Sequence, residues 1–332
     1  MTAARGIDLR PLAEAIGEAE QVIDDYVRTG AVVWGEELAA TVEPLRGAIR
    51  RGRLDGWVAC RGERSESPSA SGHAGPLAAV GGQGLGLVVC LGRAGTGRIL
   101  FAHLLSDRAE EGLAARLVGR VVAWLRAAGL RHIASQASLV AHQEAIHHAF
   151  LGLGFRAIER VVMSTTLTEE PPDRSSAPGY DVIGWDDEYL KRVAQLFHDA
   201  NRGTVDALVY PQFRALEETE RMVQAVRDGG AGAFVEEASG IVLHDRALCG
   251  AIMLVRSEPE QGFVVVVAVA SAHQGQGVGR ALLSRTLASA WQAGIRTVEL
   301  TVTDENRPAV TLYRRLGFSI KRRMTAYVWE AT

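Results

Sequence analysis

One stretch of the sequence, residues 264–283, restricts the possible folds more than any other. It begins with an apolar run at 264–270, passes through a loop with glycines at 275, 277 and 279, and then takes up helical spacing. A buried strand that leads through glycines into a helix exposes backbone N–H groups at a helix N-terminus, which carries partial positive charge. Glycines let the backbone approach an anion without obstruction by side chains. The stretch therefore predicts an α/β fold with a phosphate or pyrophosphate site at this turn.

Two common phosphate-binding loops do not fit the glycine spacing. No Lys-Ser or Lys-Thr pair follows the three glycines, as a P-loop would require. A dinucleotide-binding fingerprint places its last glycine three positions after the second, whereas the step here is two. The loop also lies far along the chain with one short β-α-β unit after it, which is unsuited to a doubly wound dinucleotide domain.

A second motif follows the glycine loop. A helical pattern over residues 282–292 stops at an Ala-Gly pair, and residues 297–303 alternate as a strand. The loop reads Gln-x-x-Gly-x-Gly from Gln274, and residues 306–318 read NRPAVTLYRRLGF. At this separation the two motifs resemble the acyl-CoA pyrophosphate loop and the Asn-x-x-Ala-x-x-Leu-Tyr-x-x-x-Gly-Phe signature of the GNAT superfamily of N-acyltransferases.

The second half of the sequence repeats the first. The segment AGLR at 128–131 matches AGIR at 293–296, and LGF at 153–155 matches LGF at 316–318. We therefore predict an α/β protein of two tandem GNAT folds, each a mixed, mostly antiparallel central sheet with flanking helices. Residues 168–179 are rich in proline and charge and too poor in apolar residues to form a core. The predicted domains are residues 1–167 and 180–332, with a linker at 168–179.

The first copy departs from the GNAT pattern. Residues 110–111 are both glutamate and align with the glycine loop, where two carboxylates would repel a pyrophosphate. Phe150, which has no hydroxyl proton to donate, falls opposite Tyr313, and Gln143 falls opposite Asn306. We predict that the first domain is degenerate and non-catalytic, and that residues 180–332 form the catalytic domain.

The GNAT resemblance implies acetyl-CoA as a cosubstrate, bound between two splayed parallel strands at 263–270 and 297–303. It implies pantetheine hydrogen bonds along the first strand, pyrophosphate contacts in the loop, and an asparagine on the pantetheine arm. The residues expected to bind the cosubstrate are Val267, Ala268, Val269, Gln274, Gly275, Gln276, Gly277, Val278, Gly279, Arg280 and Asn306. Tyr313 is implied as the general acid that protonates the leaving CoA thiolate.

The base that deprotonates the amine is less defined. Strand 263–270 carries no glutamate, although some GNAT enzymes place one there. Glu299, on the next strand, is our candidate catalytic base. The alternatives are an ordered water chain with no dedicated base, or one of the side chains His244, Glu236, Glu237 and Asp304.

The predicted reaction is acetyl transfer from acetyl-CoA to a primary amine of a small molecule or peptide by direct attack. One alternative is a protein acetyltransferase that acts on an N-terminus or a lysine. Another is a non-catalytic acyl-CoA-binding regulatory module. The sequence leaves open the acceptor and the oligomeric state.

Composition and sequence pattern restrict which other partners the protein can bind. A formal net charge of −3, without a Lys/Arg block interleaved with aromatic residues, argues against nucleic acid. No apolar run reaches the roughly 18 residues of a membrane span, and the N-terminus has no apolar signal segment, so we expect a cytoplasmic protein. We expect no metal, because His142, His147 and His148 form no His-x-x-x-His pair.

Overall fold

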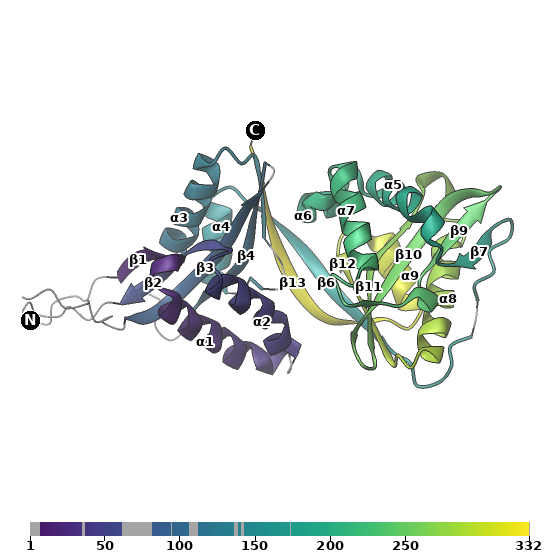
Figure 1. Ribbon diagram of the computed structural model, residues 1–332, viewed down its shortest axis with the longest axis horizontal. Helices are drawn as coiled ribbons and strands as arrows, with labels where there is room; N and C mark the ends of the chain where they lie inside the picture. The colour runs from purple at the N-terminus through teal and green to yellow at the C-terminus, as the bar shows by residue number, and fades with distance from the viewer. Residues whose placement is uncertain are drawn as a thin grey trace, which may run out of the picture. The chain divides into compact units, whose positions relative to one another are not determined.

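The chain forms two compact units in the computed structural model, which describes residues 7–34, 37–61, 82–93, 95–105, 112–135, 139–140, 143–172 and 174–331. Unit 1 comprises residues 1–158 with 325–332, and unit 2 comprises residues 159–324 (Figure 1). Both are α/β structures in which helices flank a mixed sheet. No helix within the described ranges combines the length and apolar character of a membrane span.

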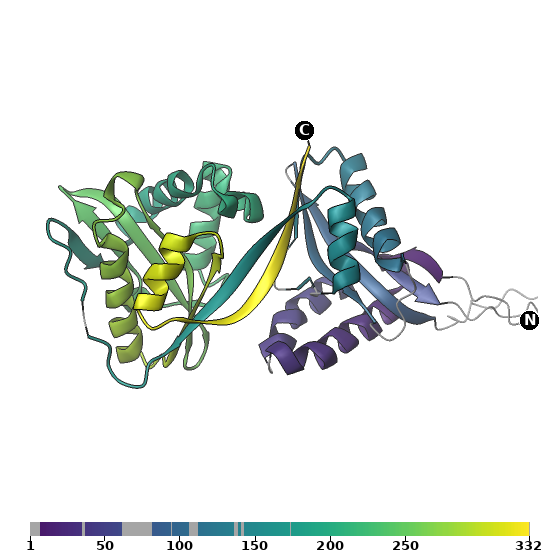
Figure 2. The ribbon, with the colours of Figure 1, turned by 180° about the vertical axis from the view of Figure 1, so that it is seen from behind.

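Unit 1 is a sheet with helices on both faces. Its strands run in the order β1 (Ile7–Pro11), β2 (Asp55–Arg61), β3 (Gln83–Arg93), β4 (Thr96–Leu104) and β5 (His132–Ser135). Neighbouring strands are antiparallel except β4 and β5, which are parallel. After the short turn η1 (Leu12–Glu14), α1 (Ile16–Trp34) and α2 (Glu37–Arg50) cover one face, and α3 (Leu113–Ala127) and α4 (Glu144–Gly152) cover the other (Figure 2).

Strand periodicity explains these two layers in unit 1. Side chains alternate between the faces of a strand, so each β-strand with apolar residues at successive positions buries both faces. On β2, Val58 and Cys60 pack in the core under α1, whereas Trp57 and Ala59 pack in the core under α3.

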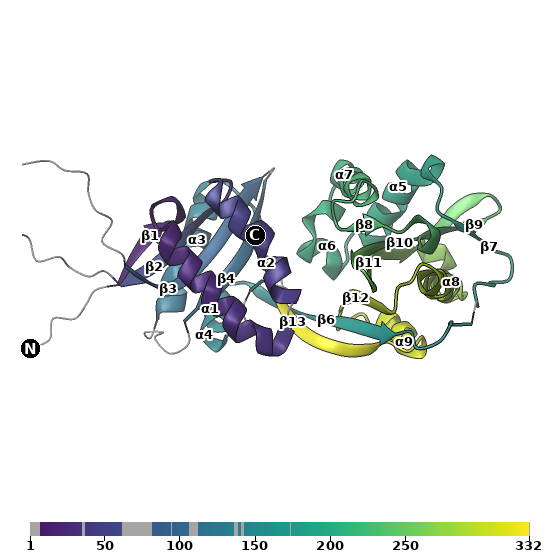
Figure 3. The ribbon, with the colours of Figure 1, turned by 60° about the horizontal axis from the view of Figure 1, so that its bottom comes forward.

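Unit 2 has the same layered arrangement. Its strand order is β6 (Arg156–Thr166), β12 (Thr297–Thr303), β11 (Gln261–Val269), β10 (Ala247–Glu258), β9 (Gly240–His244) and β7 (Asp181–Gly184), with β8 (Ala233–Phe234) also paired to β10. Only β11 and β12 are parallel among the pairs described for this unit. Helices α5 (Leu190–Asn201), α6 (Val205–Val209) and α7 (Leu216–Arg227) lie on one face, and α8 (Val278–Gln292) and α9 (Arg307–Arg315) on the other (Figure 3). Short turns η2 (Asp187–Tyr189), η3 (Pro211–Phe213), η4 (Glu236–Ala238) and η5 (Ser271–His273) join these elements.

The two sequence repeats exchange their last strands. Strand β6 ends the first repeat, yet it pairs with β12 in unit 2, from Arg160 opposite Thr303 to Thr166 opposite Thr297. Strand β13 (Ser319–Glu330) ends the second repeat, and its residues 328–330 pair with β5 in unit 1. Each unit is therefore completed by a strand from the other repeat.

This exchange sets unit boundaries that differ from the predicted domains 1–167 and 180–332 with a linker at 168–179. Because β6 and β7 both belong to the unit 2 sheet, residues 168–179 connect two strands of one unit. The backbone N–H of Leu167 donates to the carbonyl of Arg296 at 2.7 Å, and the Gln292 amide donates to Glu170 at 3.0 Å. The predicted boundary came from the proline- and charge-rich residues 168–179, and this local pattern holds no information on which sheet the preceding residues join.

Candidate active site

A cavity of about 240 Å³ lies in unit 2 where β11 and β12 separate. The two strands pair from Gln261 opposite Thr297 to Val264 opposite Leu300, where their described pairing ends. The register of β11 against β10 also shifts at this point, which leaves Val265 as an extra residue. Such a β-bulge bends a strand and ends regular pairing. Residues 265–269, which lie beyond the described pairing with β12, line the cavity.

Six of the residues expected at the acyl-CoA site line this cavity. They are Val267, Ala268, Val269, Gln274, Asn306 and Tyr313. The Gln274 amide donates to the Val269 carbonyl at 3.1 Å, so the loop is fixed to the end of β11. The Asn306 side-chain oxygen accepts the backbone N–H of Ala309 at 3.3 Å and caps α9. The splayed strands and the start of α9 thus bring the two sequence motifs together.

The glycine loop leads directly into α8. Gly277 is the N-cap residue with a φ of +87°, a conformation that glycine adopts without steric cost. Within the described chain no side chain caps this helix, so backbone N–H groups of its first turn are available to an anion. The other loop residues expected to bind the cosubstrate lie in this turn and do not line the cavity: Gly275, Gln276, Val278, Gly279 and Arg280.

Tyr313 contributes a buried phenol to the cavity. Its side chain is 7% exposed, and burial raises its pKa to about 12, with a further increase from the Asp206 charge and an opposing effect of Arg160. The hydroxyl makes no hydrogen bond to the described residues. The phenol therefore stays protonated near neutral pH and is free to donate to a group bound in the cavity.

A partly buried ion pair that the sequence did not single out also lines the cavity. Arg160, 2% exposed on β6, donates from Nη1 to Oδ1 of Asp206 and to Oγ1 of Thr303, the latter at 2.7 Å. Its Nη2 donates to the Tyr210 hydroxyl at 3.3 Å, and Thr303 donates to Asp206 Oδ1 at 3.1 Å. Asp206 is the one carboxylate lining the cavity in the part of the chain that the structure describes. No sequence motif indicated this pair, because Arg160 lies in the first repeat and Asp206 in the second.

The side chains considered as the base lie elsewhere. Glu299 is 4% exposed, does not line the cavity, and accepts a hydrogen bond from Lys321 Nζ at 2.7 Å. Asp304 accepts a hydrogen bond from Arg323 at 2.9 Å, and this pairing holds the pKa of Asp304 below its usual range. The role of Glu299 as base stays a prediction that this geometry does not support.

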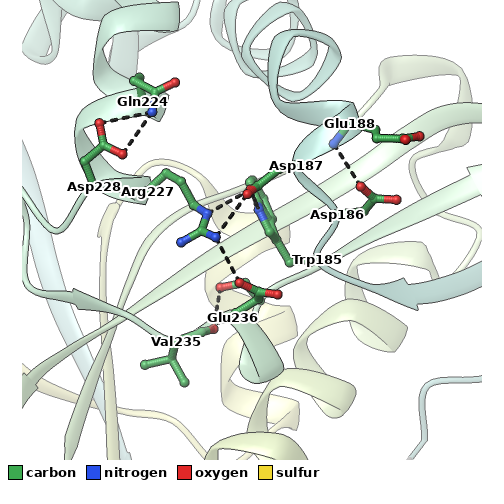
Figure 4. Close-up of polar contacts among 10 residues, drawn as sticks. Trp185, Asp186, Asp187, Glu188, Gln224, Arg227, Asp228, Val235 and Glu236 are labelled. Carbon is green, nitrogen blue, oxygen red and sulfur yellow. Dashed lines mark hydrogen bonds and ion pairs between the residues drawn. The ribbon is translucent and has the colours of Figure 1, made fainter.

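The other side chains considered as the base, Glu236, Glu237 and His244, also do not line the cavity. Glu236 accepts a hydrogen bond from Arg227 at 3.0 Å, and Arg227 binds both carboxylate oxygens of Asp187 (Figure 4). This network joins η2, α7 and η4 on the surface of unit 2. The ring nitrogen Nδ1 of His244 lies 2.8 Å from the carbonyl of Gly179, and Glu237 is exposed.

The matching place in unit 1 is filled by the chain itself. Strands β4 and β5 pair as far as Ile99 opposite Ser135, as β11 and β12 do before they separate. Beyond that point, the Gln143 side chain accepts the backbone N–H of Leu104 at 2.9 Å and donates to its carbonyl at 2.7 Å. The edge of β4 that corresponds to the open edge of β11 is therefore hydrogen-bonded within the protein.

The other residues noted in the first repeat have structural roles or lie outside the described residues. Phe150 is buried and stacks on Tyr327 with ring centroids 4.3 Å apart. His147 Nδ1 lies 3.0 Å from the Tyr327 hydroxyl. Glu110, Glu111 and His142 lie outside the described residues. Among the residues that are described, no group of His, Cys, Asp and Glu side chains is placed to hold a metal ion.

Comparison with known families and curated proteins matches the second repeat. The profile of the Acetyltransferase (GNAT) family matches residues 191–318. Curated relatives are mycothiol acetyltransferases. That of Pseudarthrobacter chlorophenolicus is 44% identical over 63 residues, or 19% of this chain and 20% of that protein. That of Nocardiopsis dassonvillei is 31% identical over 147 residues, or 42% of this chain and 41% of that protein. The chain thus matches less than half of the length of these relatives.

Solved structures match over nearly the whole chain. A GCN5-related N-acetyltransferase from Sphaerobacter thermophilus has a TM-score of 0.67 at 18% identity and covers 99% of this chain and 97% of its own. A tandem GNAT protein from the clavulanic acid biosynthesis pathway has a TM-score of 0.54 at 19% identity, with 98% and 99% covered. At these identities the likeness establishes the fold, and that fold has two GNAT copies.

Proposed function

We propose that this chain is an acyltransferase of the GNAT family, and that unit 2 of its two tandem GNAT folds transfers an acetyl group from acetyl-CoA to a primary amine of a small molecule or peptide. The observation that carries this proposal is the cavity in unit 2. There the end of β11, the start of the glycine loop at Gln274 and the Tyr313 phenol meet in one space.

The residues present fit acetyl-CoA as the cosubstrate. Residues 267–269 line the cavity and pair with β10 but have no described pairing with β12, so a pantetheine arm can approach the strand edge that β12 leaves. The uncapped N-terminus of α8 suits a pyrophosphate, and residues 274–280 include no carboxylate that would repel it. Asn306, beside the cavity, is placed to contact the pantetheine arm while its oxygen caps α9.

In the proposed reaction the neutral amine nitrogen attacks the thioester carbonyl carbon. A C–N bond forms, the C–S bond breaks, and the proton that leaves the nitrogen passes to water. Tyr313 gives its phenolic proton to the departing thiolate and recovers one from solvent. Backbone N–H groups at 267–269 are suited to stabilising the oxyanion of the tetrahedral intermediate. We assign proton removal to water, because the carboxylates and histidines considered as bases do not line the cavity.

We further propose that unit 1 does not bind acyl-CoA. The Gln143 side chain occupies both backbone groups of Leu104, so a pantetheine arm would have to break two hydrogen bonds that are already made. Phe150, at the position of Tyr313, is stacked in the core and has no proton to donate. These observations support a structural role for the first repeat.

The test is to mix the full-length protein with acetyl-CoA and a panel of primary amines and to follow CoA thiol release. Calorimetry measures acetyl-CoA binding in parallel. We expect binding and amine-dependent thiol release. Protein that binds acetyl-CoA but releases no thiol with any amine would indicate a non-catalytic acyl-CoA-binding module. Protein that does not bind acetyl-CoA would overturn the proposal. A small-molecule acceptor is supported by the relatives named mycothiol acetyltransferases, and transfer to peptides but not to small amines would favour a protein acetyltransferase.

A further inference from the structure

Asp206 lines the cavity, and one of its carboxylate oxygens has no hydrogen bond to the described residues. Its Oδ1 accepts hydrogen bonds from Arg160 and Thr303, whereas its Oδ2 has no hydrogen bond to the described residues. The side chain retains 25% exposure although Arg160 beside it retains 2%. An ionised carboxylate has lone pairs for several donors, so Asp206 can still accept hydrogen bonds from a bound group.

The two charged groups on this wall of the cavity differ in how available they are to a ligand. Asp206 and Arg160 are the only charged side chains among the described residues that line it. Both terminal nitrogens of Arg160 are committed to Asp206, Thr303 and Tyr210, and the guanidinium is buried. A ligand can therefore bond to the free oxygen of Asp206, whereas both terminal nitrogens of Arg160 already donate hydrogen bonds within the protein.

Building on the proposed function, we propose that Asp206 binds the acceptor as an ammonium ion and that Arg160 is the residue that positions Asp206. The acceptor class is then a primary amine that arrives protonated and has no carboxylate next to the amine. A carboxylate next to the amine of the acceptor would be repelled by Asp206. No free cation on the described cavity wall would offset this repulsion.

Asp206 is better suited to this role than to that of a base. Hydrogen bonds from Arg160 and Thr303 to Oδ1 hold the Asp206 carboxylate in a fixed position and leave Oδ2 to accept a hydrogen bond from a bound ammonium group. The bound ammonium loses its proton to water before its nitrogen attacks. Because Tyr313 lines the same cavity, an amine held at Asp206 lies close to the group that protonates the thiolate.

Arg160 reaches this site because of the strand exchange. It lies on β6, before residues 168–179, and pairs with Thr303 on β12. The first repeat thus supplies a residue to the acceptor pocket of unit 2 even though its own cosubstrate edge is closed. Selection of the acceptor depends in this way on both repeats.

The test uses Asp206→Asn in the full-length protein with alaninamide, glucosamine and phenethylamine as acceptors. We expect KM for the reacting amine to rise about tenfold or more, because a charged partner is lost while the side-chain shape is kept. The KM for acetyl-CoA should change less than twofold. Asp199→Asn is the matched control, since Asp199 is an exposed carboxylate on α5 that accepts a hydrogen bond from Gln195 and does not line the cavity.

Two further measurements sharpen the assignment. Alanine, which differs from alaninamide by its carboxylate, should be at least tenfold poorer than alaninamide with the wild type, and Asp206→Asn should narrow this difference. Arg160→Lys should raise the amine KM about threefold or more at unchanged acetyl-CoA KM, with folding checked by circular dichroism.

Each result that would contradict the role of Asp206 can be told apart from the others. An unchanged amine KM in Asp206→Asn, or an equal rise in both KM values, would overturn the assignment. A loss of kcat that disappears at high pH would show that Asp206 is a base instead. If the wild type acetylates no amine, calorimetry of the same amines with CoA-saturated protein tests whether Asp206 binds the ammonium group. Weaker ammonium binding to Asp206→Asn would support the site although the proposed reaction fails, and equal binding or none would refute it.

Discussion

Tyr313 shows how one buried side chain joins the fold to the proposed chemistry. It lies on α9, whose start is set by Asn306 as N-cap, and its ring packs with Phe318 after the helix ends. Burial removes the phenolate from contact with water and so favours the protonated form. The same packing that stabilises α9 therefore keeps a proton available at the cavity.

We expect Tyr313→Phe to lower kcat about 100-fold, because general acid catalysis typically contributes factors of this size. The Kd for acetyl-CoA should be unchanged, since the phenyl ring keeps the packing. Stopped-flow or steady-state thiol release together with calorimetry measures both quantities. Wild-type turnover in this variant would remove Tyr313 from the role of general acid.

The raised pKa of Tyr313, about 12, also predicts a dependence of stability on pH. In the unfolded chain the phenol ionises near its ordinary pKa of about 10, whereas the folded protein holds the proton to higher pH. This contribution to stability is complete below pH ~10 and is lost as the pH rises toward ~12. It amounts to about 2–3 kcal/mol when complete, by the conversion of roughly 1.4 kcal/mol per pKa unit.

Urea unfolding of the wild type and Tyr313→Phe at pH 8 and pH 11 measures this dependence. The wild type should lose more stability than the variant over this interval. Parallel losses in the two proteins would show that Tyr313 does not carry the effect.

At the scale of elements, the sequence located the strands and the helix around the glycine loop but not the strands that pair with them. Apolar spacing predicted a strand at 297–303, and the structure has β12 at Thr297–Thr303. The glycine loop and the 306–318 motif placed Tyr313 and Asn306 at one cavity, because local order and spacing encode a β-α-β unit. The assignment of β6 to the first domain differed from the structure, because hydrogen bonding between strands is set by contacts distant in sequence.

The dependence on contacts distant in sequence also explains why Arg160 and Asp206 were not predicted as site residues. Arg160 and Asp206 are 46 positions apart and meet only because β6 pairs with β12. Residues 202–210 carry no recognisable motif for an acceptor. Glu299 was nominated from strand alternation alone, which cannot show that its carboxylate would bind Lys321 on β13.

The placement of β6 predicts the behaviour of fragments. Residues 168–332 lack β6, so the pairing of β12 with that strand is lost, along with Val161 and Met163 from the unit 2 core. We expect this fragment to be unfolded or insoluble and unable to bind acetyl-CoA. Residues 156–332, which restore β6, should fold more stably by circular dichroism and thermal unfolding. Equal stability of the two fragments would contradict the assigned role of β6.

At the scale of the whole molecule, the two GNAT folds differ at one corresponding strand edge. In unit 2 the edge of β11 is open and leads to a cavity with a phenol and a carboxylate. In unit 1 the corresponding edge of β4 is satisfied by Gln143. A backbone edge that is already hydrogen-bonded offers no gain to a ligand that would replace those bonds. We therefore expect one cosubstrate site in the chain.

The stoichiometry of acetyl-CoA binding tests this claim most directly. Isothermal titration should give one site per chain for the wild type. Gly277→Glu, which places a carboxylate at the N-terminus of α8, should abolish that site. Gly112→Glu is the matched control, because Gly112 is the N-cap of α3 and has a similar φ of +81°. We predict one site in this control. Two sites in the wild type, or loss of binding in Gly112→Glu but not in Gly277→Glu, would contradict the account.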